Sequence, residues 1–129
     1  MAIKVSQNKT KTYKYIPLSE REDEKPFSVT IRPLSSRELA ILEDKLLKIS
    51  KDESISFNSG SFNWEICKHG IVNWENLTDE KGKQVSIKIK DGLVTDESLN
   101  MLPLYIITEV AGVITAISKD PENAELFVK

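Results

Sequence analysis

The chain has 129 residues and a mass of 14.6 kDa, the size of one ordinary domain. Its 18 basic and 20 acidic side chains give a formal net charge of −2, which argues against an obligate nucleic-acid-binding protein. A hydrophobic fraction of 40% is enough for a folded core. A single Cys and a single His exclude an internal disulfide framework and an ordinary structural zinc site, so we expect no metal and no cofactor.

The N-terminal segment is basic, because lysine is the only charged residue type among the first 14 residues. We expect residues 1–11 to form a flexible basic arm and residues 12–129 to form a single domain. Lysines beside tyrosines can bind a phosphate backbone, but lysines next to an edge strand more commonly prevent aggregation. We therefore expect no nucleic-acid partner. The segment lacks the apolar stretch of a secretory signal, and the longest apolar-rich run, 104–117, is too short to span a bilayer, which predicts a cytoplasmic protein with no membrane partner.

The next segments predict an antiparallel hairpin. Residues 12–16 are rich in Tyr and Ile and are typical of a short strand. Phe27, Val29 and Ile31 alternate with polar residues, which indicates a second strand over 27–32 with one buried face. A charged loop separates the two strands.

Two helices are predicted in the middle of the chain. Ser35 and Glu38 have the spacing of a capping box, and a helix over 36–50 is expected to follow. Ile41 lies on the polar face of that helix and is not explained by its pattern. A second helix is predicted over 61–73, where aromatic and aliphatic residues recur at helical spacing.

The C-terminal half is expected to contain one more strand, over 85–89, a short helix or turn over 95–101 and a long last helix over 103–119. The fold class is therefore α+β, with small antiparallel strands packed against about three helices. The predicted core consists of Leu39, Leu42, Leu46, Trp64, Ile71, Trp74, Leu104, Ile107 and Ile114.

The last helix has two apolar stripes. One stripe contains Leu104, Ile107, Ala111 and Ile114, and the stripe beside it contains Ile106, Val110, Val113 and Ile117. Either both stripes face the core, or one of them is presented to a partner. The candidate partner-binding residues are therefore Ile41, Ile106, Val110, Val113 and Ile117.

No residue pattern favours catalysis. Cys67 and His69 are two positions apart, which on a helix points them in opposite directions, so they cannot share a metal ion. Cys67 lies on an apolar stripe and is expected to be a buried, inert thiol. The acidic residues form solvated runs, and no glycine-rich phosphate loop is present in the sequence. We expect a protein that is not an enzyme.

Three stretches follow one another in an order typical of one protein family. Arg32–Glu38 reads RPLSSRE before an amphipathic helix, Gly70–Gly82 reads GIVNWENLTDEKG, and Leu99–Glu109 reads LNMLPLYIITE. In this order, over residues 12–119, the chain resembles the small tail assembly chaperones of long-tailed bacteriophages and prophages.

The resemblance implies a non-catalytic phage protein that binds the hydrophobic tape-measure protein during tail assembly and helps to recruit the tail-tube protein. It also implies a location in the cytoplasm of the bacterial host and absence from the mature virion. The alternative is a structural component of the virion, in the tail or the head–tail region.

Overall fold

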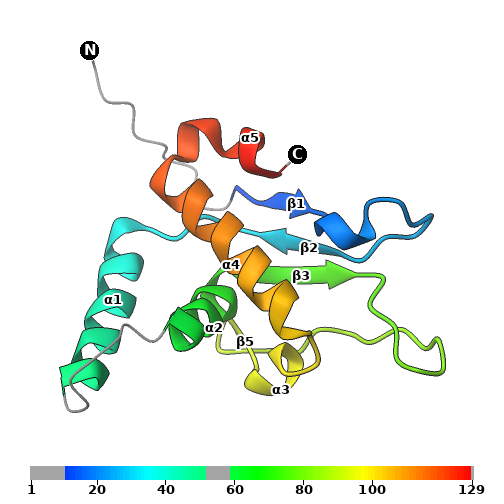
Figure 1. Cartoon of the computed structure of the whole chain (residues 1–129), viewed down its shortest axis with the longest axis horizontal. Helices are drawn as coiled ribbons and strands as arrows, with labels where there is room; N and C mark the ends of the chain where they lie inside the picture. The colour runs from blue at the N-terminus through cyan, green and yellow to red at the C-terminus, as the bar shows by residue number, and fades with distance from the viewer. Residues whose placement is uncertain (1–10, 52–58, 129) are drawn as a thin grey trace.

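The computed structural model describes residues 11–51 and 59–128, with the backbone alone for 46–51 and 59. The basic arm predicted over 1–11 lies outside the described residues except for Lys11, and the side chain of Leu46 lies outside them too. The fold is α+β, as predicted. A small antiparallel sheet carries helices on one side, and the long helix α4 crosses in front of it in Figure 1.

The sheet has three antiparallel strands in the order β1 (Tyr13–Tyr15), β2 (Ser28–Ile31) and β3 (Ile71–Glu75). The predicted hairpin is confirmed, because Tyr15 pairs with Val29 and the loop between β1 and β2 begins with the short 3-10 helix η1 (Leu18–Glu20). As the central strand, β2 is buried more completely than its alternating sequence indicates.

The capping box and the first helix are also confirmed. Helix α1 runs over Ser36–Lys51. The Glu38 amide donates to the Ser35 hydroxyl at 3.1 Å, and the Ser35 amide donates back to the Glu38 carboxylate at 3.0 Å. This exchange satisfies two backbone donors that a helix start would otherwise leave free.

The second helix ends earlier than predicted. Helix α2 runs over Ser59–Gly70, and residues 71–73, predicted to be helical, form the start of β3 instead. The backbone oxygen of Gly70 accepts a hydrogen bond from the Arg32 amide, so the chain leaves the helix directly into pairing with β2.

A bulge in β3 explains why its sequence has helical spacing. Thr30 pairs with Asn73 but Ile31 pairs with Ile71, so Val72 is an extra residue in the strand. A bulge changes the alternation of side chains by one position. Ile71 and Trp74, three residues apart, are therefore both buried from one strand.

The strand predicted over 85–89 is wrong for most of its length. Its last residue belongs to the two-residue strand β4 (Ile89–Lys90), which pairs with β5 (Leu93–Val94) around Asp91 and Gly92, whose φ values are 54° and 79°. Two positive φ angles in a two-residue loop are typical of a type I′ hairpin turn. Before the hairpin, the Val85 oxygen accepts from the Trp74 indole and the Lys88 amide donates to the Ser98 hydroxyl, in place of a strand ladder.

The last third of the chain is helical. The predicted short helix is α3 (Asp96–Leu99), capped by the Thr95 hydroxyl, and the long helix is α4 (Leu104–Lys119), with Pro103 just before its first turn. Asp120 ends α4, and the 3-10 helix η2 (Pro121–Asn123) leads into α5 (Ala124–Val128).

One core joins the sheet, α2 and α4. Of the predicted core, Leu42, Ile71, Trp74, Ile107 and Ile114 are buried, and Leu39 and Trp64 are half-buried at its edge. Leu104 is a wrong prediction: it is 72% exposed, because in the first turn of α4 it is Ile106 and Ile107 that face the core.

Candidate functional site

Both apolar stripes of α4 face the core. Ile106, Val110 and Ile117 are buried, as are Ile107 and Ile114 of the other stripe, and Val113 is half-buried. The prediction that Ile106, Val110 and Ile117 bind a partner is therefore wrong, because these side chains are buried in the core. The physical reason is that the two stripes are neighbours on one side of the helix, and α2 and the core cover both of them. Of the five candidate partner-binding residues, Ile41 on α1 is the exposed one.

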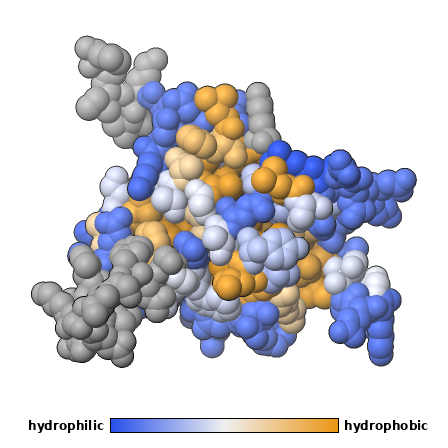
Figure 2. All heavy atoms as spheres, viewed as in Figure 1, coloured by the Kyte–Doolittle hydropathy of each residue, from blue (hydrophilic) through white to orange (hydrophobic). Residues whose placement is uncertain are grey.

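Among the described residues, four of the exposed large apolar side chains lie at the beginning of α4 and on η1, and the others, Ile41, Ile89, Leu126 and Phe127, lie on α1, β4 and α5. Leu104 is 72% exposed, Tyr105 60%, Met101 48%, and Leu18 of η1 65%. Figure 2 shows apolar residues reaching the surface on the face that α4 crosses. Large apolar side chains gathered at one place commonly mark an interaction site, whereas scattered ones do not. We call Leu18, Met101, Leu104 and Tyr105 the α4 patch.

Glu109 connects the two segments of the α4 patch. It lies one helical turn after Tyr105, and its Oε2 atom accepts from the Leu18 amide at 2.9 Å and from the Tyr15 hydroxyl at 2.5 Å. Burial and this hydrogen bond raise the pKa of Tyr15 to about 12, so its hydroxyl remains a donor at neutral pH. The carboxylate thus holds η1 against α4 and brings Leu18 next to the helix.

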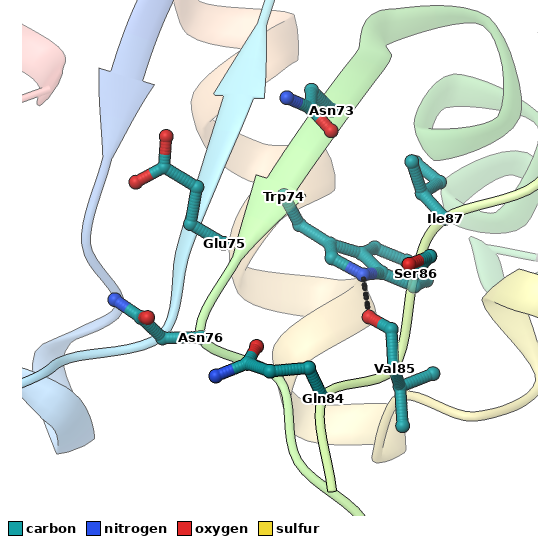
Figure 3. Close-up of a pocket in the computed structure, with 8 residues that line it drawn as sticks. All are labelled: Asn73, Trp74, Glu75, Asn76, Gln84, Val85, Ser86 and Ile87. Atoms are coloured by element: carbon teal, nitrogen blue, oxygen red, sulfur yellow. Dashed lines mark hydrogen bonds between the residues drawn. The ribbon is translucent and has the colours of Figure 1, made fainter.

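A hollow of the described surface lies beside β3. It has a volume of about 450 Å³, and Trp74 forms its wall with the indole nitrogen 2.9 Å from the Val85 oxygen (Figure 3). Glu75 is its one ionisable side chain; the remaining lining residues are amides, a hydroxyl, aliphatic groups and the indole. A nucleophile with a base, or two carboxylates in different environments, would be needed for hydrolytic chemistry. This hollow provides neither.

Cys67 and His69 point to different parts of the molecule. Cys67 is buried as predicted, with its Sγ atom 3.4 Å from the Ile107 oxygen, and burial raises the pKa of its thiol to about 12. His69 Nδ1 lies 2.9 Å from the Glu65 oxygen, within α2 itself. Among residues 11–51 and 59–128, no group of three or more His, Cys, Asp or Glu side chains could hold a metal ion. None of the helices in that part of the chain has the length and apolarity to cross a membrane.

The stretches that carry the family resemblance have structural roles. In the second stretch, the Asp79 carboxylate accepts from the Lys81 and Lys83 amides, and Gly82 has a φ of 77° that favours glycine. Asn76, also at positive φ, donates from its side chain to the Pro26 oxygen. In the third stretch, Glu109 is the residue that positions the α4 patch.

Comparison with protein-family models, with characterised proteins and with solved structures gave no match to this chain.

Sequence reasoning missed the α4 patch. Met101, Leu102, Leu104 and Tyr105 are apolar residues close together at a helix start, which is a signal that could have been read. The position of Leu18 depends on Glu109, 91 residues later in the chain, and no local pattern predicts that contact.

Proposed function

We propose that this chain is a tail assembly chaperone of a long-tailed phage or prophage. In this proposal it binds the hydrophobic tape-measure protein in the cytoplasm of the bacterial host, keeps it soluble and helps to recruit the tail-tube protein. It acts by binding alone, without catalysis, and leaves before the virion is complete. The ordered resemblance over residues 12–119 supports this proposal.

The α4 patch is the observation that carries the proposal. A chaperone for apolar helical segments needs a folded domain that leaves large apolar side chains in solvent. The α4 patch provides four such side chains on the surface of a packed core. The stripe of α4 that includes Val110 is excluded from this role, because it is part of the core.

Co-expression with the tape-measure protein of the same phage genome tests the proposal. We expect the soluble fraction of the tape-measure protein to rise in the presence of this chain, and the two proteins to co-purify. An unrelated small protein expressed at the same level serves as the control. Equal insolubility with and without this chain would refute the chaperone function. Recovery of the chain at a fixed copy number in mature virions would establish the structural component instead.

A further inference from the structure

The α4 patch contains a carboxylate with unused hydrogen-bonding capacity. Both donors that reach Glu109 bind its Oε2 atom, and none of the described residues donates to Oε1 or forms an ion pair with this side chain. The side chain is half-buried, and Leu18 and Tyr105 lie beside it. A carboxylate in such surroundings binds a cation more strongly than one surrounded by water.

Acidic residues outnumber basic ones in the loop that follows Leu18. The loop over residues 19–25 contributes four acidic side chains and two basic ones, and the guanidinium of Arg21 lies over the ring of Tyr15, whose hydroxyl donates to Glu109. Complementary charges across an interface guide the encounter and fix the register of the partner. The loop has a net charge of −2, which together with the Glu109 carboxylate favours a basic ligand over an acidic one.

The outer face of α4 carries a row of small residues. Thr108, Gly112 and Ala116 follow Leu104 at four-residue spacing, and the first two are exposed. Small residues at this spacing form a shallow row into which the side chains of a second helix can pack. The row is bounded by the α4 patch at one end and by Lys119 at the other.

We propose that the outer face of α4 binds an amphipathic helix of a partner protein, whose apolar side chains cover the α4 patch and whose Lys or Arg binds Glu109. This inference rests on the proposed function and specifies the segments bound: apolar helices that carry a basic residue within the apolar face. An acidic or uncharged helix of equal hydrophobicity binds more weakly.

Two synthetic peptides test this preference on the full chain. Each has 20 residues with leucines along one helical face, and they differ only in a central Lys or Gln. We expect fluorescence anisotropy to give a dissociation constant about tenfold lower for the Lys peptide, the gain of one charge-assisted hydrogen bond in a partly desolvated site. Equal affinities for the two peptides would overturn the proposal.

Glu109→Gln is the informative variant, because its amide oxygen can still accept from Leu18 and Tyr15 while the charge is lost. We expect this variant to bind both peptides equally, and the control Glu125→Gln on α5 to keep the preference for Lys. Leu104→Ser should weaken the binding of both peptides, with an unchanged circular dichroism spectrum. A preference for Lys that persists in Glu109→Gln would refute the role of Glu109.

Two further results separate this inference from the proposed function. Rescue of the tape-measure protein that is unaffected by Leu104→Ser and Glu109→Gln would refute the binding surface and leave the chaperone function standing. A preference for the Lys peptide without any rescue would refute the chaperone function and leave the helix-binding surface standing. Sedimentation showing a dimer of this chain that Leu104→Ser dissociates would identify a second copy as the occupant and overturn the proposal.

Discussion

Glu38 joins the end of β2 to the beginning of α1. Its carboxylate accepts from both terminal nitrogens of Arg32, at 3.1 and 2.7 Å, and from the Ser35 amide. The hydrogen bonds from Arg32 are the main cause that lowers the pKa of Glu38 from 4.5 to about 2. The RPLSSRE stretch can therefore be explained by a structural need: it fixes the turn between a strand and a helix.

Glu38→Gln should lower the free energy of unfolding at pH 7 by about 1–3 kcal/mol, since an amide cannot bind the guanidinium through two oxygens. Because the folded-state pKa is depressed, the stabilisation by Glu38 is complete above pH 4.5 and is lost as the pH falls toward 2. The difference in the free energy of unfolding between the unsubstituted chain and Glu38→Gln should therefore shrink as the pH falls from 4.5 to about 2.

Urea denaturation at pH 7 and at steps between pH 5 and 2 measures this difference. Glu43→Gln is the control, because Glu43 is an exposed carboxylate of the same helix, and its effect should stay within about 0.5 kcal/mol. Equal effects of the two substitutions at pH 7 would show that the contact with Arg32 contributes nothing to stability.

At the scale of the element, local pattern and tertiary contacts decide different parts of the fold. The hairpin of β1 and β2, α1 and α4 have strong periodicity or caps, and the sequence predicts them within a few residues. The boundary between α2 and β3 is not predictable in this way, because the pairing with β2 and the bulge at Val72 determine it. The same holds for the α4 patch, which depends on a contact between distant segments.

The crossing of α2 and α4 depends on a glycine. A Cβ atom at Gly70 would lie 2.7 Å from Cδ1 and 2.8 Å from Cγ2 of the buried Ile114. Gly112 on the outer face of α4 has no atom within 4 Å of the corresponding position. The two glycines therefore differ in packing, although both lie in helices.

Gly70→Ala should lower the free energy of unfolding by about 1–3 kcal/mol, since a β-branched core residue has little room to move. Gly112→Ala should raise it by about 0.5–1 kcal/mol through helix propensity. Denaturant titration measures both changes. In the double variant Gly70→Ala/Ile114→Ala the cost should be less than the sum of the single costs, and an additive result would contradict the predicted clash.

At the scale of the whole molecule, α5 closes one side of the fold. It contacts α4 and β1, which is one of the two edge strands of the sheet, and Ala124 is buried there while Val128 packs against the core. Figure 1 shows α5 lying beside β1. An uncovered edge strand can pair with another chain, so a helix beside the edge protects the protein against association.

Ala124→Glu should release α5, because a carboxylate cannot be buried at a position without a partner, and should lower the free energy of unfolding by about 1–3 kcal/mol. The exposed edge of β1 should then cause self-association, seen as a sedimentation coefficient that rises with protein concentration more steeply than in the unsubstituted chain. Glu125→Ala changes an exposed position of the same helix and should leave both properties unchanged. If Ala124→Glu behaved like Glu125→Ala, α5 would have no part in protecting the sheet.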